Sequence, residues 1–354
     1  MGRMLFSKKK EIVGIDIGSS SVKLVQLKEQ KGGWQLVNVG IQPLPPEAIV
    51  DNTLMDSSSV IEAVKGLMKG LSVKVKDVAC SISGNTVIIR KIKLPAMTPE
   101  ELEDQIQWEA EQYIPFDIND VNIDFQILEP DEDDPSRMNV LLVASKKEII
   151  NDYVNVFAET GLRLVIVDVD SFAVQNAFEL NYETDPEEVV ALINVGASIL
   201  NLNVVRGGSS LFTRDVQVGG NLFTEEIQKQ FALSSEEAEQ VKVTGEYPDK
   251  AKLKDVIARV NETLAVEMRR SLDFYNTTAN EGRIARVYLS GGAAKSSMLA
   301  EAVQNKLGVP VEMLDPLAKI TCSEKEFDPE YLREIGPLVT VAVGLATRRV
   351  GDKW

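Results

Sequence analysis

Two glycine-containing turns in this chain carry residue types that bind phosphate, and they stand at matching places in its two halves. The first turn is Asp16-Ile17-Gly18-Ser19-Ser20-Ser21-Val22-Lys23, and the second is Asn194-Val195-Gly196-Ala197-Ser198. Each lies between two apolar runs that predict strands, and a third predicted strand follows. Glycine lets the backbone approach phosphate oxygens closely, and the amides and hydroxyls of such a turn donate hydrogen bonds to them.

This repeat predicts two pseudo-symmetric halves whose turns face each other across a cleft that suits a nucleotide. One such turn alone would be read as an ordinary β-hairpin, so it is the duplication that favours phosphate binding. Lys23 would add positive charge if the alternation of strand side chains points it into the cleft. The residues expected to line the cleft are Gly18, Ser19, Ser20, Ser21, Lys23, Asn194, Gly196, Ala197 and Ser198.

Two further segments have residue types that could hold the nucleoside part of such a ligand. Gly291 and Gly292 lie between a predicted strand and a predicted helix, so a helix N-terminus would meet the nucleotide there. An ordinary strand-to-helix turn explains this segment equally well. Glu239 and Lys242 are three residues apart, which places a carboxylate and an ammonium on one helix face, able to hold ribose hydroxyls and a purine. By itself such a pair is most often a solvent-exposed ion pair.

The composition limits the chemistry that the chain can perform. Its 354 residues include no histidine, which excludes Ser-His-Asp and Cys-His nucleophile systems and imidazole-based zinc sites. With 38 basic and 54 acidic side chains the formal charge is −16, so we expect no nucleic-acid binding. Cys80 and Cys322 stand far apart, and neither a signal peptide nor an apolar run of about 18 residues is present. We therefore expect a cytoplasmic protein without a membrane span.

The periodicity of apolar residues predicts an α/β chain. The strands expected early in the first half cover residues 11–17, 22–28, 34–41 and 78–82. A unit of strand, helix, two strands and helix follows between about 85 and 163, and Thr98-Pro99-Glu100-Glu101 is a capping box at the start of its first helix. After a polar linker near residue 185 the second half begins as the first did, and it includes a long helix over 252–276.

The order of these pieces resembles the actin-like ATPase superfamily. The matching segments are the first phosphate turn 16–23, a connecting helix 170–179, the second phosphate turn 194–202, an adenosine turn 289–295 and a second connecting helix 336–347. This resemblance covers essentially the whole chain. It implies an α/β actin-like ATPase (ribonuclease H-like) fold, with two pseudo-symmetric halves around a nucleotide cleft.

A closer resemblance is to the PilM family of type IV pilus assembly, which is itself similar to the cell-division protein FtsA. It is carried by residues 13–23, by Glu109-Ala110-Glu111-Gln112-Tyr113-Ile114-Pro115-Phe116, and by 218–224 with 237–242. It adds Gly219 and Gly220 to the expected nucleotide contacts. The implied division is a first actin-like half of 1–84, 164–185 and 337–354, an FtsA-like inserted small subdomain of 85–163, and a second half of 186–336 with a helical subdomain at about 220–280.

The resemblance also implies roles for three residues. Asp16 would hold Mg²⁺ through water, and Asp170, at the start of the connecting helix, would orient an attacking water. Actin-like hydrolases usually have aspartate where this chain has Asn194, and a neutral amide cannot add charge to the magnesium shell or accept a proton. We therefore expect binding of ATP and Mg²⁺ with weak or absent hydrolysis. The alternative is that one carboxylate suffices and slow hydrolysis proceeds.

A partner follows from the same resemblance. PilM-type proteins bind the cytoplasmic N-terminal tail of the inner-membrane protein PilN in a groove beside the small subdomain, as scaffolds coupled to the pilus motor. The groove is expected along helix 100–112, residues 113–116 and strand 87–94. Pilus motor ATPases and further copies of the chain are additional candidate partners.

The end of the sequence bears on location and on competing functions. FtsA-like proteins continue into a membrane-binding helix, whereas this sequence stops at Trp354, so we expect peripheral association with the inner membrane through the partner. A small-molecule kinase of the same superfold and an FtsA-like polymerising cytoskeletal protein are the alternative functions. Phosphorylation of a small alcohol or acid would favour the first, and nucleotide-dependent sedimentation would favour the second.

Overall fold

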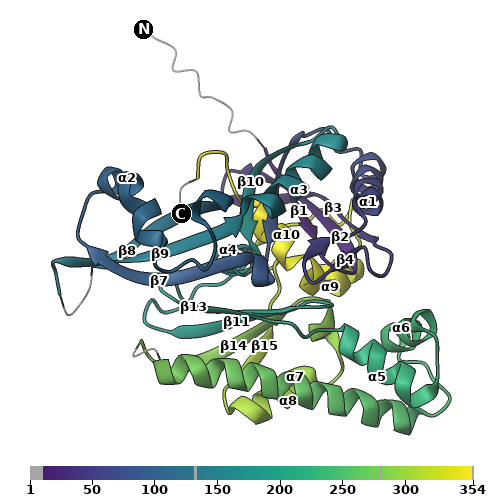
Figure 1. Ribbon diagram of the computed structural model, residues 1–354. Coiled ribbons are helices and arrows are strands. Elements are labelled where there is room, and N and C mark those ends of the chain that lie inside the picture. The colour runs from purple at the N-terminus through teal and green to yellow at the C-terminus, as the bar shows by residue number, and fades with distance from the viewer. Residues whose placement is uncertain (1–10, 131–133, 279–280, 353–354) are drawn as a thin grey trace.

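A computed structural model describes residues 11–130, 134–278 and 281–352; the remaining residues, including the last two of the chain end discussed above, lie outside the description. One large sheet has six strands in the order β10-β6-β1-β2-β3-β16 (Figure 1). Strands β1, β2 and β3 are antiparallel neighbours, and β6 runs parallel to β1 and to β10. The bounds are β1 Val13–Ile17, β2 Ser21–Gln30, β3 Gly33–Pro43, β6 Asp77–Ile82, β10 Arg163–Val169 and β16 Ile320–Thr321.

The second large sheet repeats this plan with five strands in the order β13-β12-β11-β14-β15. Again three antiparallel neighbours come first, and a parallel strand joins the other edge of the first of them. Because each half starts with strand, glycine turn and strand, the two phosphate turns occupy equivalent places in the two sheets. The bounds are β11 Val189–Val195, β12 Leu200–Arg206, β13 Ser209–Val216, β14 Ile284–Ser290 and β15 Val311–Met313.

Two connecting helices pack against each other: α4 (Asp170–Asn181) and α10 (Thr340–Ala346). All seven residues of α10 and eight of the twelve residues of α4 are buried, so neither helix shows the one-sided pattern of a surface helix. Glycine permits their close approach: a Cβ on Gly344 would lie 1.7 Å from the carbonyl oxygen of Ala173, and one on Gly14 would lie 2.2 Å from that of Ala342. Helix α10 is thus held against both β1 and α4.

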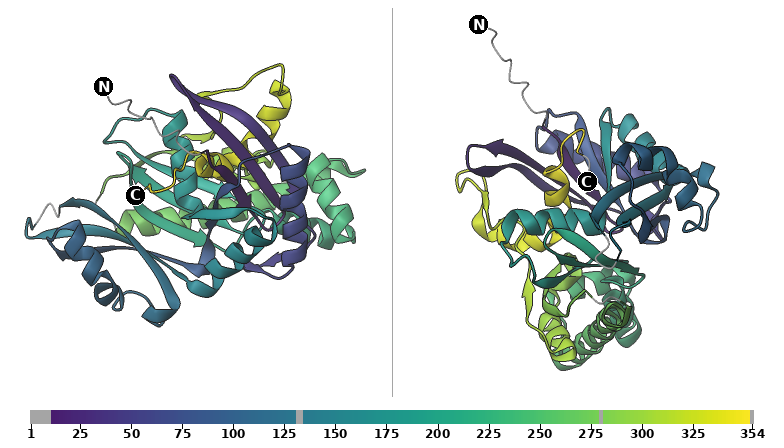
Figure 2. Two further views of the ribbon diagram at one scale, coloured as in Figure 1. Left: turned by 90° about the horizontal axis from the view of Figure 1, so that it is seen from above. Right: turned by 90° about the vertical axis from the view of Figure 1, so that its left-hand side faces the viewer.

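The expected inserted unit has its own three-stranded sheet, in the order β7-β9-β8, and projects from the first half (Figure 2). Helix α2 covers one face, where Leu102 and Ile106 pack against Val140 and Leu142. The capping box predicted at Thr98 and Glu101 is present at the start of this helix. The bounds are β7 Val87–Pro95, α2 Pro99–Ala110, β8 Val121–Pro130, β9 Arg137–Lys146 and α3 Lys147–Glu159.

Helices line the far side of the second half, and the longest is α7, along which α8 lies (Figure 1). The stripe of apolar residues expected on the long helix is buried in the core, as at Leu264 and Met268. The bounds are α1 Ser57–Gly70 in the first half, then α5 Asn221–Phe231, α6 Ser235–Thr244, α7 Lys250–Thr278, α8 Leu299–Leu307 and α9 Pro329–Ile335. The short pair β4 Ile49–Val50 and β5 Thr53–Leu54 completes the strands of the described residues.

Two contacts bear on the division into units. Tyr153 and Phe157 of α3 pack into the core of the six-stranded sheet, and Ile320 of β16 pairs with Trp34 of β3. The division into two halves and an inserted subdomain stays a proposal, because these two contacts join residues across its expected boundaries. We assign β16 to the sheet of the first half because its backbone is paired there.

Candidate nucleotide-binding site

The two glycine turns meet across a cleft. The hydroxyl of Ser198 donates a hydrogen bond to the hydroxyl of Ser19 over 2.9 Å. Each turn is closed in the same way, since the amide of Gly18 donates to the carbonyl of Ser21 and the amide of Gly196 donates to the carbonyl of Ile199. The sequence repeat therefore corresponds to a repeated backbone geometry, and the turns face each other.

A cavity of about 80 Å³ lies between the turns. The expected residues that line it are Asp16, Gly18, Ser19, Ser20, Lys23, Asp170, Asn194, Gly196, Ala197 and Ser198. The expected residues outside its lining are Ser21, Gly219, Gly220, Glu239, Lys242, Gly291 and Gly292. The structure thus brings the two phosphate turns and both aspartates together, while the segments expected around the nucleoside lie beyond this cavity.

Lys23 points into the cleft. Its ammonium lies 3.3 Å from the carboxylate of Asp16, and a Cβ added to Gly18 would lie 2.7 Å from the lysine nitrogen. Asp16 and Lys23 face each other across the β1–β2 pair, and both side chains are mostly withdrawn from solvent. The ammonium of Lys23 therefore lies next to Gly18 of the first turn, where it can attract phosphate oxygens.

Asp170 begins α4 and accepts a hydrogen bond from the hydroxyl of Ser81 over 2.6 Å. Withdrawal from bulk water and the nearby Asp16 carboxylate raise the pKa of Asp170 from 3.8 to about 7, while hydrogen bonds from Ser81 and Ser83 oppose this rise. A carboxyl group with such a pKa exchanges its proton near neutral pH, and a cation bound nearby would favour its ionised form.

The raised pKa predicts a pH-dependent stability. The folded-state pKa lies above the unfolded value, so ionised Asp170 opposes folding above about pH 7, and stability rises as pH falls from about 7 towards 4. We expect Asp170→Asn to raise the free energy of unfolding by about 1–2 kcal/mol at pH 8, with a smaller gain at pH 5. Denaturant unfolding at both values measures this, with exposed Asp104→Asn as control for removing one charge. An equal gain at the two pH values would contradict the prediction.

Asn194 belongs to a row of polar side chains that crosses the five-stranded sheet. The register pairs Ser290 with Asn194, Asn194 with Asn201, and Asn201 with Asp215. Burial raises the pKa of Asp215, which also accepts a hydrogen bond from the amide of Gly84. Asn201 and Ser290 lie within the expected segments 194–202 and 289–295 but were not among the individual residues predicted, and Asp215 lies outside every predicted segment of the site. Polar residues at matching positions in apolar strands were a usable signal for all three.

The glycines outside the cavity support the second turn from behind. A Cβ on Gly219 would lie 2.5 Å from the carbonyl oxygen of Gly196, and the amide of Gly220 donates to that same carbonyl. Gly291 has φ +89° and lies against the backbone of Val195, where a Cβ would come within 2.4 Å of the carbonyl oxygen. Close backbone approach at these three positions holds the second turn in place.

Glu239 and Lys242 form an ion pair on α6, and both side chains also contact the hydroxyl of Thr224 on α5. The Thr224 hydroxyl donates to the Glu239 carboxylate over 2.6 Å, and the Lys242 ammonium lies 3.1 Å from it. The pair is therefore more ordered than an isolated surface ion pair. Its role with a nucleoside stays a prediction.

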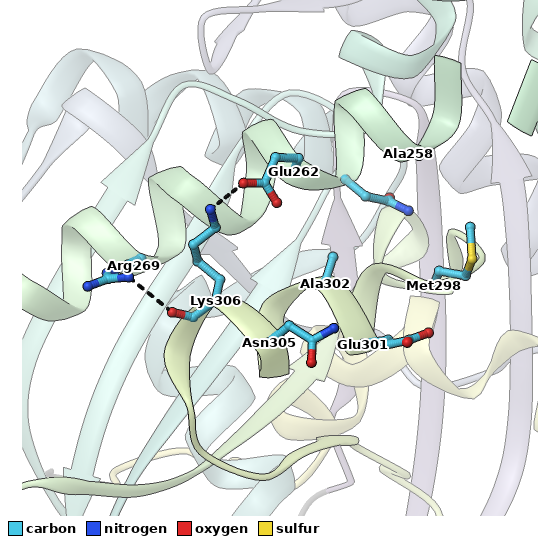
Figure 3. A pocket seen from close by; sticks show the side chains of 9 residues that line it. Ala258, Glu262, Arg269, Met298, Glu301, Ala302, Asn305 and Lys306 are labelled. Carbon is cyan, nitrogen blue, oxygen red and sulfur yellow. Dashed lines mark hydrogen bonds and ion pairs between the residues drawn. The ribbon is translucent and has the colours of Figure 1, made fainter. Parts of the chain in front are cut away.

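A second cavity, of about 470 Å³, lies between α7 and α8 and contains none of the expected site residues (Figure 3). Two of its charged side chains form an ion pair, Lys306 with Glu262, and Arg269 donates to the backbone carbonyl of Lys306. The chemistry expected from the sequence therefore concentrates in the smaller cavity between the turns.

Within residues 11–130, 134–278 and 281–352, no group of three or more acidic or cysteine side chains could hold a metal ion. No helix there is both long and apolar enough to cross a membrane. The first result is compatible with magnesium, which keeps most of its water ligands and is bound through few carboxylates.

Distant structures share the fold. The ethanolamine utilization protein EutJ from Carboxydothermus hydrogenoformans is 16% identical with a TM-score of 0.59, covering 95% of this chain and 88% of that chain. MreB5 of Spiroplasma citri bound to ADP is 13% identical with a TM-score of 0.53, covering 95% of this chain and 94% of that chain. At these identities the likeness concerns the fold alone, and it confirms the actin-like architecture expected from the order of the segments.

A nearer likeness identifies the family. A solved structure described as the PilM-PilN type IV pilus biogenesis complex is 31% identical with a TM-score of 0.87, and the match covers 97% of this chain and 100% of that chain. The family model for type IV pilus assembly protein PilM matches residues 14–350. On both grounds, and in agreement with the cleft between its two glycine turns, the chain belongs to the PilM family of type IV pilus assembly proteins.

Proposed function

We propose that the chain is an ATP-binding scaffold of type IV pilus assembly that binds the cytoplasmic tail of PilN. The observation that carries the nucleotide half of this proposal is the pair of phosphate turns, which meet with Lys23 below one of them. The bound ADP of MreB5, which shares the fold, supports it further. The likeness to a PilM-PilN complex supports the partner.

Magnesium fits the residues present. Asp16 is 8% exposed at the end of β1 and lines the cavity, so its carboxylate can hold a hydrated Mg²⁺ through water. Bound with the nucleotide, Mg²⁺ would neutralise phosphate charge. Asp16 and Asp170 then have a favourable partner in a cavity where their negative charges otherwise oppose each other. The hydroxyls of Ser19 and Ser198 could contact phosphate oxygens once their mutual hydrogen bond is broken.

Hydrolysis is proposed to be weak or absent, because Asn194 is neutral. We expect purified protein incubated with labelled ATP and Mg²⁺, then desalted, to retain intact ATP over hours. Bound Mg²⁺ would lower the pKa of Asp170, and the ionised carboxylate could then accept a proton from an attacking water. Slow formation of ADP is therefore compatible with the scaffold function. Turnover of ATP at about 1–100 per second, the range of kinases, would contradict weak or absent hydrolysis and would favour the function of a small-molecule kinase.

The partner surface is proposed on the inserted subdomain, in the region of α2 and the segment that follows it. Trp108 is 78% exposed and Tyr113 is 37% exposed, and both are unusually open for large aromatic side chains. Helix α2, which contains Trp108, carries five acidic residues and no basic one, and Glu111 follows its last residue, so the surface suits a tail that combines apolar and basic side chains. The acidic residues within the helix are Glu100, Glu101, Glu103, Asp104 and Glu109.

This assignment predicts the effect of two substitutions. Trp108→Ala combined with Glu111→Lys should weaken binding of a synthetic PilN tail peptide at least about 30-fold, since exposed aromatic anchors dominate such interfaces. ATP retention should stay unchanged. Calorimetry measures the affinity for the peptide. The matched control is Phe274→Ala, which removes a 51% exposed ring from α7. Loss of peptide and ATP together would indicate misfolding, and unchanged peptide affinity would place the groove elsewhere.

Location and further partners follow from this proposal. A chain bound to the tail of an inner-membrane protein would be held at the cytoplasmic face of that membrane through its partner. Motor ATPases and further copies of the chain are candidates for additional contacts of the scaffold. Nucleotide-dependent sedimentation of the purified chain would favour the polymerising alternative over it.

A further inference from the structure

A continuous chain of hydrogen bonds leads from the second half to the base of the inserted subdomain. The hydroxyl of Ser290 donates to the amide oxygen of Asn194 over 3.2 Å, and the amide nitrogen of Asn194 donates to the oxygen of Asn201 over 3.2 Å. Asn201 donates in turn to Asp215 over 2.9 Å. The other carboxylate oxygen of Asp215 accepts from the backbone amide of Gly84.

The polarity of this chain is fixed at its Gly84 end. The N–H of Gly84 can only donate, and an ionised Asp215 can only accept, so Asn201 must turn its amino group towards Asp215. The oxygen of Asn201 then faces position 194, which must supply a donor. Asparagine supplies one and aspartate does not. Sequence analysis explains the neutral side chain of Asn194 as a weakened magnesium site. The row gives a separate, structural reason for an amide at this position, because Asn201 needs a donor there.

Gly84 is the link between two units. It follows β6 of the six-stranded sheet and opens the short 3₁₀ helix Gly84–Thr86 that leads into β7 of the inserted sheet. Its backbone has φ +72°, and a Cβ there would lie 1.8 Å from the amide nitrogen of Asn52. Because Gly84 is confined on one side by Asn52 and bonded to Asp215 on the other, movement of the second half will displace it.

Binding of a nucleotide in the cleft would move the second half relative to the first. Its 80 Å³ is far below the roughly 300 Å³ or more of an ordinary ligand pocket, so a nucleotide requires the turns to separate. The Ser19–Ser198 contact and the Asp215–Gly84 bond both join the second half to the first, and an ion pair of Lys91 with Glu281 joins it to the inserted strand β7. Separation therefore acts on all three connections.

We propose that Asn194 is a positioning residue that orients Asn201 and Asp215, and that through Gly84 this row transmits occupancy of the cleft to the inserted subdomain. The inference rests on the proposed nucleotide and PilN functions for its consequence, but the row itself is defined by the hydrogen bonds of the chain alone. It assigns to three residues of the second half a regulatory role at a surface formed by the inserted subdomain.

Exchanging the two ends of the row tests its polarity. Asn194→Asp removes the donor to Asn201 and breaks the row. Asp215→Asn alone removes an acceptor, and the row can then adapt only if all the amides turn over and the Ser290 hydroxyl accepts, which deprives the hydrogen of that hydroxyl of its Asn194 acceptor. Together the two substitutions restore it in reverse, because Asn201 can then donate to position 194 and accept from position 215. We expect amide hydrogen exchange at Gly84 to accelerate about 10-fold in each single variant and to return to within about 3-fold of the parent in the double variant.

Two results would overturn the polarity assignment. One is a double variant whose exchange is faster than that of either single variant, because independent defects add. The other is unchanged exchange at Gly84 in both single variants, which would show that the row does not restrain it. Thermal melting of all four proteins identifies any variant that fails to fold, and the restored double variant remains informative in that case.

The regulatory consequence needs a second measurement. In the parent, Mg-ATP should change the Kd of a synthetic PilN tail peptide by about 10-fold. Asp215→Ala, at a residue outside the lining of the cleft, removes the acceptor of both Asn201 and Gly84, and in this variant the factor should fall to about 1 while the affinity for Mg-ATP stays the same. If Asp215→Ala, folded by thermal melting, responds as the parent does, transmission through the row is wrong. A parent that binds neither ATP nor peptide would contradict the proposed function instead, while the exchange data at Gly84 would still decide the polarity of the row.

Discussion

The substitution Gly344→Ala is expected to lower the free energy of unfolding by about 3 kcal/mol or more, through overpacking between the connecting helices. An alanine Cβ would lie 1.7 Å from the carbonyl oxygen of Ala173 and 2.6 Å from its carbonyl carbon. Both atoms belong to the backbone of α4, so no side-chain rotation can relieve the contact. Helix α10 would have to move away from α4, and its packing against Gly14 of β1 limits that movement.

Denaturant unfolding of purified Gly344→Ala measures this loss. Gly66→Ala is the matched control, because Gly66 also lies inside a helix, α1, where a Cβ would meet nothing within 4 Å. That control should gain about 0.5–1 kcal/mol from the removal of glycine. If both alanine variants changed stability by similar amounts, close approach of α4 and α10 would not be the reason for glycine at position 344.

The substitution Lys23→Met is expected to weaken binding of Mg-ATP by about 30- to 150-fold. The ammonium lies 3.3 Å from Asp16 and just below Gly18, so it is placed to contact a phosphate held by the first turn. Hydrogen bonds to charged groups contribute about 1.5–3 kcal/mol, and about 2–3 kcal/mol corresponds to that change in affinity. Methionine keeps the length and apolar stem of the side chain while removing the charge.

Equilibrium binding of a fluorescent ATP analogue measures this change, with Lys28→Met as the matched control. Lys28 lies on the same strand, β2, but is exposed at its far end. Its replacement removes the same charge from the protein without altering the cleft. Equal affinities of the two variants would show that net charge, and not the position of Lys23, governs binding. Melting curves correct for stability lost when Asp16 loses its ion pair.

Elements defined by local patterns could be predicted from the sequence. The capping boxes at Thr98 and Ser234 are both formed, because the cap and the residue that completes it lie within one helical turn. The repeated glycine turns were recognisable for a similar reason, since a few consecutive residues determine each. The structure adds that the pairing of Asp16 with Lys23 is repeated as the pairing of Asn194 with Asn201.

Features that depend on distant contacts could not be predicted. The two residues of β16 are too few for a periodic pattern, and they become a strand only through pairing with β3. The link between Asp215 and Gly84 joins residues far apart in the chain, and no local rule connects them. Met298 has φ +65° without being glycine, so the helix predicted after Gly292 begins only at Leu299. In each case tertiary packing outweighs local preference.

The small volume between the turns has a kinetic consequence. A cavity of about 80 Å³ is far smaller than an ordinary ligand pocket of roughly 300 Å³ or more, so a nucleotide would enter only while the Ser19–Ser198 contact is broken. The apparent association rate is then the intrinsic rate multiplied by the fraction of open molecules, and dissociation waits for the same event. If the tail site proposed on the inserted subdomain favours the closed cleft, its occupancy would lengthen the dwell time of a bound nucleotide.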